Sequence, residues 1–136
     1  MKGKYDILLV DDDDVYLFVA KHIFKKLSEN LNVESFTDGE QALNYFKDCV
    51  KYNHNTPDVL LLDINMPYLD GWGFLEEYEK LRPNLNEKIN VYLVTSSDQE
   101  CDRERAKKYD HLKNYILKPV SKDKLKHVLL EVYDDL

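Results

Sequence analysis

Residues 57–67 read PDVLLLDINMP, in which four apolar residues, 59–62, end abruptly at the carboxylate of Asp63. A short, wholly apolar run is typical of a strand that is buried on both faces of a parallel sheet. Such a strand delivers Asp63 to its C-terminal end. Pro67 has no N–H for a sheet ladder and pushes Met66 towards extended geometry, so the chain must leave the sheet soon after Asp63.

Size and composition fit one globular domain. The chain has 136 residues, of which 43% are hydrophobic and 33% charged, enough for one substantial core. We therefore expect a single domain over residues 1–136. The net charge of -7 argues against direct binding to nucleic acid, which needs a clustered basic surface.

The sequence also argues against a membrane or secreted protein. No apolar run approaches the about 20 residues that a membrane helix needs, and Met1 leads into a strand without an apolar signal region. Cys49 and Cys101 lack the spacing of metal ligands. We expect a cytoplasmic protein with reduced cysteines and no membrane insertion.

Strand and helix patterns alternate along the whole chain. Strands are expected at 5–10, 33–36, 59–62, 89–94 and 115–117, and helices at 15–28, 37–50, 72–81, 99–108 and from Ser121 onwards. Alternation of this kind predicts an α/β fold, a doubly wound parallel sheet that right-handed crossovers cover on both faces.

Periodicity and capping patterns give more detail for the helices. The first helix is expected to be amphipathic, with Val15, Val19, Ile23 and Leu27 at i, i+4 intervals and with Phe18 and Phe24 beside them. Capping boxes are expected at Thr37 with Glu40 and at Ser97 with Glu100. The helix at 99–108 is mostly charged, so it should be the least firmly packed.

Polar groups follow four of the five predicted strands. They are Asp11 and Asp12, then Asp63, Thr95 and Lys118, and the C-terminal ends of parallel strands share one edge of the sheet. Each close carboxylate pair costs about 4 kcal/mol at about 4 Å and an effective dielectric of about 20. A divalent cation such as Mg²⁺ removes that repulsion. Together with a lysine and a hydroxyl, these carboxylates provide what phosphoryl transfer needs: a nucleophile, a metal site, a positive charge and a hydrogen-bond donor.

Each feature taken alone has a plainer interpretation. The acidic run can be a solvated helix start, Lys118 a surface lysine and Thr95 a strand-end cap. Their joint position, each directly after an apolar strand, favours the functional interpretation. The four histidines lack ligand spacing and are expected to be surface residues: His22, His54, His111 and His127.

Four motifs together resemble the receiver domains of two-component response regulators, typified by the chemotaxis response regulator. They are Val10-Asp11-Asp12, residues 62–67 (LDINMP) with Asp70-Gly71, Val94-Thr95-Ser96, and residues 115–119 (YILKP). The resemblance spans residues 7 to about 133. It implies the flavodoxin-like (βα)5 fold with strand order 2-1-3-4-5, the order known for this family.

The resemblance also implies a role for each site residue. Asp63 would accept the phosphoryl group, and Asp12, Asp63 and the backbone carbonyl of Asn65 would bind Mg²⁺ directly, with Asp11 holding a metal-bound water. Lys118 and Thr95 would contact the phosphoryl group. A cis peptide would precede Pro119, and Tyr115 would act with Thr95 as a switch.

The implied function is a stand-alone response regulator that a histidine kinase or a phosphotransfer protein phosphorylates. It would signal to a protein target through its fourth helix, fifth strand and last helix, catalysing only its own phosphorylation and dephosphorylation. Ser96 replaces a common alanine, and residues 109–114 lack the usual Gly-Ala. These departures affect local geometry.

Three alternatives stay open at this point. The chain can be a receiver excised from a longer hybrid protein, which Met1 disfavours. A Mg²⁺-dependent phosphatase with an aspartate nucleophile needs a second acid two residues later, where this chain has Asn65. A receiver-like module that is never phosphorylated is disfavoured because every acceptor-site residue is present.

Overall fold

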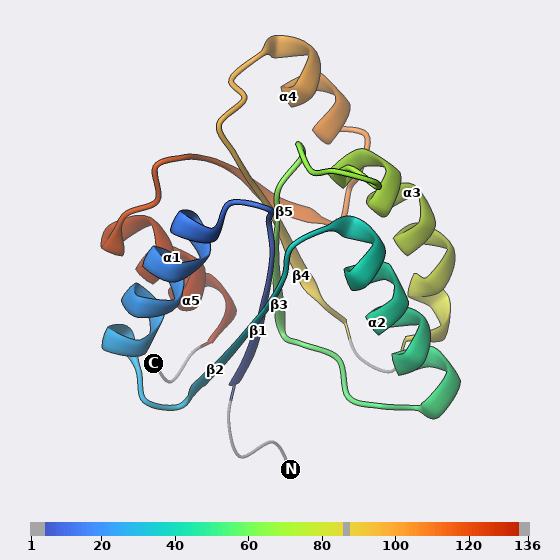
Figure 1. Cartoon of the computed structure of the whole chain (residues 1–136), viewed down its shortest axis with the longest axis horizontal. Coiled ribbons are helices and arrows are strands. Elements are labelled where there is room, and N and C mark those ends of the chain that lie inside the picture. The colour runs from blue at the N-terminus through green and yellow to red at the C-terminus, as the bar shows by residue number, and fades with distance from the viewer. Residues whose placement is uncertain (1–4, 86–87, 134–136) are drawn as a thin grey trace.

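Five parallel strands form one sheet in the predicted order, β2-β1-β3-β4-β5 (Figure 1). The structure is a computed structural model that describes residues 5–85 and 88–133. At the ends of the central strands, Val10 lies opposite Phe36 on one side and Leu62 on the other. The strands are β1 (Tyr5–Val10), β2 (Leu31–Phe36), β3 (Val59–Leu62), β4 (Asn90–Thr95) and β5 (Leu112–Leu117).

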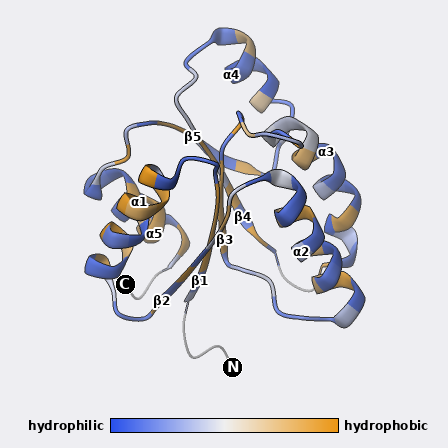
Figure 2. Cartoon of the chain, viewed as in Figure 1, coloured by the Kyte–Doolittle hydropathy of each residue, from blue (hydrophilic) through white to orange (hydrophobic). Residues whose placement is uncertain are grey.

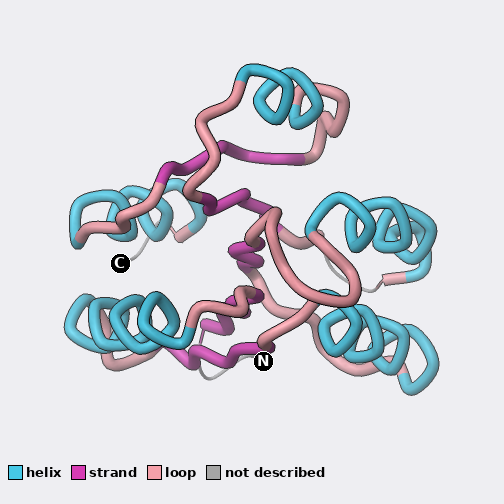
Figure 3. The backbone as a smooth tube through the Cα atoms, turned by 45° about the horizontal axis from the view of Figure 1, so that its top comes forward, coloured by secondary structure: helices cyan, strands magenta, loops and turns pink. Residues whose placement is uncertain are grey.

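Helices cover both faces of the sheet, and on each face a hydrophobic core lies between a pair of helices and the strands. Leu8 and Leu60 contribute to the core under α2 and α3, whereas Ile7 and Leu61 contribute to the core under α1 and α5. Figures 1 and 3 show the two pairs on opposite sides of the strands, and Figure 2 shows orange, apolar strands between them. The helices are α1 (Asp14–Leu27), α2 (Gly39–Tyr52), α3 (Gly71–Leu81), the 3-10 turn η1 (Arg82–Asn84), α4 (Glu100–Ala106) and α5 (Lys122–Val132).

The helices of this fold are short relative to a lipid bilayer. Within residues 5–85 and 88–133, none is both long enough and apolar enough to span a membrane.

The predicted core side of α1 is right for Ile23 and Leu27, which pack against the core, and wrong for Val15 and Val19. The buried residues of this helix are Tyr16, Leu17, Ala20 and Phe24. Val15 and Val19 of the predicted stripe are 72% and 39% exposed, and Phe18 is 73% exposed. Because α1 carries apolar residues on two sides, its periodicity did not identify the side that faces the sheet.

The N-cap of α2 lies one residue after the predicted one. The Asp38 carboxylate accepts a hydrogen bond from the Gln41 N–H at 2.8 Å, and the Gln41 side chain accepts one from the Thr37 N–H at 3.2 Å. Thr and Asp are both favourable N-cap residues, and their two possible boxes overlap in this sequence. The tertiary structure selects Asp38.

The helix α4 is shorter than predicted, and its predicted cap is wrong. Its N-cap residue, Gln99, makes no side-chain cap, while the Ser97 hydroxyl donates to Asp102 instead. The prediction of weak packing is confirmed, because no residue of α4 is buried. The contacts of α4 with α3 are made by a long side chain, because the Arg105 guanidinium lies 4.8 Å from the centre of the Trp72 ring (Figure 1).

Both edge strands are longer than their apolar residues indicated. β2 starts at residue 31 rather than 33, and β5 starts at residue 112 rather than 115. Asn32, Lys113 and Asn114 are exposed within these strands. Edge strands tolerate such polar residues, so an apolar run underestimates their length.

One of the four histidines predicted to lie on the surface has a buried side chain. The side chain of His111 is 5% exposed, and its Nδ1 lies 2.7 Å from a carboxylate oxygen of Glu79. Its ring contacts the rings of Tyr78 and Tyr109. Burial lowers the pKa of His111, which favours a neutral imidazole.

Candidate functional site

The ends of β1 and β3 bring three carboxylates together. The two strands are neighbours, and the Asp63 N–H donates to the Val10 carbonyl oxygen at 2.9 Å. Asp11 and Asp63 are 1% and 5% exposed, whereas Asp12 is exposed. One carboxylate oxygen from each of these three residues lies within 4.8 Å of the others. The predicted cluster of Asp11, Asp12 and Asp63 therefore forms.

Lys118 reaches the same cluster from the end of β5. Its Nζ lies 2.7 Å from Asp11 Oδ2 and 3.9 Å from Asp63 Oδ2. The Lys118 N–H donates to the Thr95 carbonyl oxygen at 2.9 Å, which joins the end of β5 to β4. The peptide before Pro119 is cis, as the resemblance implied.

Thr95 lies at the end of β4, and Asn65 lies in the loop after β3. Thr95 is fully buried, and its Oγ1 accepts a hydrogen bond from the Ser97 N–H at 3.3 Å. A hydroxyl that accepts can still donate its own hydrogen. Asn65 is exposed, and its backbone hydrogen-bonds the Asp63 carboxylate.

The loop after β3 holds Asp63 through a close backbone contact. The Gly71 N–H donates to the Ile64 carbonyl oxygen at 2.7 Å. A Cβ atom on Gly71 would lie 2.4 Å from the Asp63 carbonyl oxygen. The Asp70 carboxylate caps α3 by accepting from the Gly73 N–H at 2.8 Å. Only glycine at position 71 allows α3 to begin this close to Asp63.

The buried carboxylates oppose their own ionisation. Burial, followed by the charge of Asp11, raises the pKa of Asp63 to about 6, although Lys118 acts in the opposite direction. Burial also raises the pKa of Asp11, again against the effect of Lys118. The single ammonium group does not fully compensate these charges, so the cluster has the electrostatics of a cation site.

The donor set fits a hard divalent ion. The cluster offers three carboxylate oxygens that lie within 4.8 Å of one another. Mg²⁺ prefers such ligands and usually keeps some positions for water or phosphate oxygens. The residues present therefore suit Mg²⁺ better than a thiolate- or imidazole-binding metal.

Comparison with known proteins agrees with this geometry. The family model described as the response regulator receiver domain matches residues 7–130. This chain belongs to that family. As a receiver domain, it is a signalling domain of two-component systems rather than an enzyme for a separate substrate, and it accepts a phosphoryl group on an aspartate. Receiver domains bind Mg²⁺ in their acidic site and interact with histidine kinases or phosphotransfer proteins.

Receivers of similar sequence occur in proteins of different length. The probable methanogenesis regulatory protein FilR2 of Methanothrix harundinacea is 30% identical over 129 residues, which are 93% of this chain and 79% of FilR2. The probable transcriptional regulator ycf27 of Guillardia theta is also 30% identical, and there the match covers 92% of this chain but 44% of the relative. The receiver thus spans less than half of ycf27.

Solved receiver structures share the fold over nearly the whole chain. A two component response regulator from Cytophaga hutchinsonii has a TM-score of 0.81 and 27% identity, covering 97% of this chain and 99% of that one. CheY in a CheX-CheY-BeF3-Mg²⁺ complex from Borrelia burgdorferi has a TM-score of 0.75 and 26% identity, covering 95% and 90%. The strand order 2-1-3-4-5 is thus confirmed as that of a CheY-like receiver.

Sequence reasoning missed one residue that this receiver places at the site. The Lys118 Nζ lies 4.6 Å from the centre of the Tyr16 ring, and Tyr16 is buried within reach of the charges of Asp11 and Asp63. A tyrosine in the first turn of an amphipathic helix gives no signal of such a contact. Tyr16 also lies outside the apolar stripe predicted for α1.

Proposed function

We propose that Asp63 is the acceptor of this receiver and that its phosphate comes from a histidine kinase or a phosphotransfer protein. One observation carries the proposal: Asp63 is the buried carboxylate that shares Lys118 with Asp11 and adjoins the exposed Asp12. In the reaction an Asp63 oxygen attacks the phosphorus of phosphohistidine. A P–O bond forms, the P–N bond breaks, and the imidazole nitrogen keeps the electron pair and takes a proton from solvent.

The neighbouring groups stabilise the charge that moves in this step. Lys118 supplies a fixed positive charge, and Thr95 supplies a hydroxyl donor for a phosphoryl oxygen. Asp12, Asp63 and the Asn65 carbonyl would hold Mg²⁺ directly, with Asp11 on a metal-bound water. When bound, Mg²⁺ supplies positive charge for the phosphoryl oxygens. The BeF3 and Mg²⁺ named for the Borrelia burgdorferi CheY complex support this role.

We propose that residues 1–136 form one receiver that signals to a protein target and does not bind nucleic acid itself. A phosphatase is disfavoured because Asn65 stands where a second acid is needed. Self-catalysed phosphorylation and dephosphorylation are the only reactions we propose. We propose a cytoplasmic location, in keeping with the free thiols of Cys49 and Cys101.

An exposed apolar side of α1 supports docking of the phosphodonor. Val15 and Phe18 are 72% and 73% exposed, Val19 is 39% exposed, and this turn directly follows Asp12 and its neighbours. Figure 2 shows orange at the start of α1. Exposed apolar side chains that follow the acidic cluster in the chain fit a protein partner that brings phosphohistidine to Asp63.

Labelling with a small phosphodonor tests the proposal. With Mg²⁺ and acetyl phosphate, the intact mass of the wild type is expected to increase by one phosphoryl group. Asp63→Asn is expected to show none, because an amide is not a nucleophile for phosphorus. Asp14→Asn removes an exposed carboxylate nearby and should label normally. Undiminished labelling of Asp63→Asn would reject Asp63 as the acceptor.

Magnesium is expected to raise the melting temperature by about 10 °C at about 100 times its Kd. The pKa of Asp63, about 6, is above its unfolded value. The stability that this carboxyl contributes is therefore present below pH about 4 and lost as the pH rises through about 6. At pH 7.5 the carboxylates are charged and repel one another, so the increase in melting temperature that Mg²⁺ causes should be larger there than at pH 5. Calorimetry measures both increases.

A pair of variants completes the magnesium experiment. Asp12→Ala is expected to lose most of the Mg²⁺ effect, whereas Asp14→Ala should keep it. An equal effect in Asp12→Ala would place the ion elsewhere.

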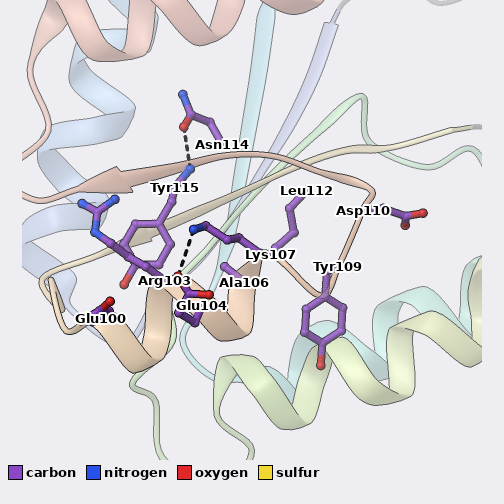
Figure 4. Close-up of a pocket in the computed structure, with 10 residues that line it drawn as sticks. All are labelled: Glu100, Arg103, Glu104, Ala106, Lys107, Tyr109, Asp110, Leu112, Asn114 and Tyr115. Atoms are coloured by element: carbon purple, nitrogen blue, oxygen red, sulfur yellow. Dashed lines mark hydrogen bonds and ion pairs between the residues drawn. The ribbon is translucent and has the colours of Figure 1, made fainter.

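We propose that the signal leaves through the surface of α4, β5 and α5. A cavity of about 560 Å³ lies between α4 and β5, and Figure 4 shows Tyr115 and Arg103 side by side in its lining. The Arg103 guanidinium lies 4.8 Å from the centre of the half-buried Tyr115 ring, and the Tyr115 hydroxyl donates to the Ser97 carbonyl oxygen at 2.6 Å. These contacts connect β5 to the loop after Thr95.

Phosphorylation is expected to act on this surface through Thr95. A phosphoryl group that accepts from the Thr95 hydroxyl would draw the end of β4 towards the site and move the loop that Tyr115 contacts. Because α4 has no buried residue, it can shift at small cost. Beryllium fluoride with Mg²⁺ should change amide exchange at residues 95–108 and at Tyr115. An identical response in Thr95→Ala would refute this coupling.

A further inference from the structure

We infer that Tyr16 is a positioning residue for Lys118, and this inference rests on the proposed phosphorylation of Asp63. Lys118 Nζ lies 4.6 Å from the centre of the Tyr16 ring. The carboxylates of Asp11 and Asp63 compete for the same ammonium group. It is 2.7 Å from Asp11 Oδ2 and 3.9 Å from Asp63 Oδ2. The aromatic face is the third group that fixes the position of this ammonium.

The surroundings of the contact make it strong. Tyr16 is 6% exposed and the Lys118 side chain 17% exposed. A cation over an aromatic face is held more tightly where water is excluded. The ring also presents no acceptor to compete with phosphoryl oxygens. It can therefore hold Lys118 near Asp63 both before and after phosphorylation.

The hydroxyl of Tyr16 does not explain why the residue is there. Within residues 5–85 and 88–133, this buried hydroxyl oxygen has no hydrogen-bond partner, which is unfavourable for stability. The nearby carboxylates of Asp11 and Asp63 add to the burial that raises the pKa of Tyr16, so the phenol stays neutral. What Tyr16 provides to the site is thus its ring.

Tyr16 reaches this position through the side of α1 that faces the sheet. It is buried together with Leu17, Ala20 and Phe24, and the Asp13 carboxylate accepts from its backbone N–H at 3.2 Å. The N-cap fixes the first turn of α1 relative to the acidic loop. The ring is therefore held rigidly under Lys118.

The test compares three variants of the full chain by the rate of labelling with acetyl phosphate and Mg²⁺. Tyr16→Leu is expected to slow labelling about 5- to 30-fold, the range of a desolvated cation–π contact. Tyr16→Phe keeps the ring and should recover most of the rate. Phe24→Leu removes a buried ring from the same helix, away from Lys118, and should label at the wild-type rate despite a lower melting temperature.

A double-mutant cycle and a spectrum separate positioning from general damage. In a Lys118→Ala background, Tyr16→Leu should slow labelling no further, because the two residues act through one contact. In NMR spectra, the Lys118 ε-methylene protons should lie upfield in wild type and Tyr16→Phe and move downfield in Tyr16→Leu. This shift is read without phosphorylation, so it tests the contact even if Asp63 is not the acceptor.

Specific results would overturn the inference. They are wild-type labelling by Tyr16→Leu, equal slowing by Tyr16→Phe, the same slowing with Lys118 absent, or an unshifted methylene signal in Tyr16→Leu. A wild type that takes up no phosphoryl group overturns the proposed function and the positioning role with it.

Discussion

Phe46→Ala is expected to lower the free energy of unfolding by about 3–5 kcal/mol, as for other truncations of buried aromatic residues. Phe46 is fully buried on α2, and its ring centre lies 5.1 Å from that of Tyr45, 5.9 Å from Phe74 and 5.3 Å from Tyr78. The lost ring would leave a cavity between α2, α3 and the sheet. Urea unfolding should show an earlier midpoint with an unchanged m-value.

Tyr52→Ala is the matched control for this truncation. Tyr52 ends the same helix and is 57% exposed, so its loss is expected to change the free energy of unfolding by no more than about 0.5 kcal/mol. A loss below about 1 kcal/mol in Phe46→Ala would mean that this core closes around the gap. The two variants therefore measure how rigidly the core under α2 and α3 is packed.

The position of the site was predictable because its side chains follow apolar strands. Asp11, Asp63 and Lys118 each come directly after such a strand, and parallel pairing places the ends of β1, β3 and β5 at one edge. Asp11 and Asp63 are buried at that edge, whereas Lys118 is partly exposed. Once the strands were recognised, the sheet brought together residues that are more than 100 positions apart.

Features that depend on choosing between similar alternatives were not predictable. Val15 and Tyr16 are neighbours on a helix with two apolar sides, and only the packing of α1 against the sheet buries one and exposes the other. Asp38 and Thr37 compete for one cap. His111 is buried because Tyr78, Tyr109 and Glu79 surround it. In each case tertiary contacts decide between options that are locally equivalent.

The loop after β3 combines a feature that the sequence predicted with one that it did not. Pro67 predicted that the chain leaves the sheet soon after Asp63, and a helix was expected from residue 72. The sequence did not indicate that residue 71 touches the backbone of Asp63. A Cβ at this position would meet the Asp63 carbonyl oxygen at 2.4 Å and the Ile64 Cα at 2.8 Å. Both atoms belong to the backbone, so neither can rotate away.

Gly73→Ala provides the comparison that isolates this contact. A Cβ on Gly73 would come closest, at 2.7 Å, to a methyl carbon of Leu69, the end of a side chain that can move. Alanine is also the better helix former at this position in α3. The Gly73→Ala variant is therefore expected to fold and to label close to the wild-type rate.

Gly71→Ala is expected to cost about 1–3 kcal/mol of stability and to slow phosphorylation of Asp63 by up to about 100-fold. The added methyl group must push α3 or the Asp63 backbone aside. This displacement also strains the hydrogen bond from the Gly71 N–H to the Ile64 carbonyl oxygen. A displacement of about 1 Å suffices for such a loss of rate. Labelling is measured by intact mass at a temperature where both glycine variants are folded. Equal labelling rates in Gly71→Ala and Gly73→Ala would show that the loop after β3 accommodates the methyl group without moving Asp63.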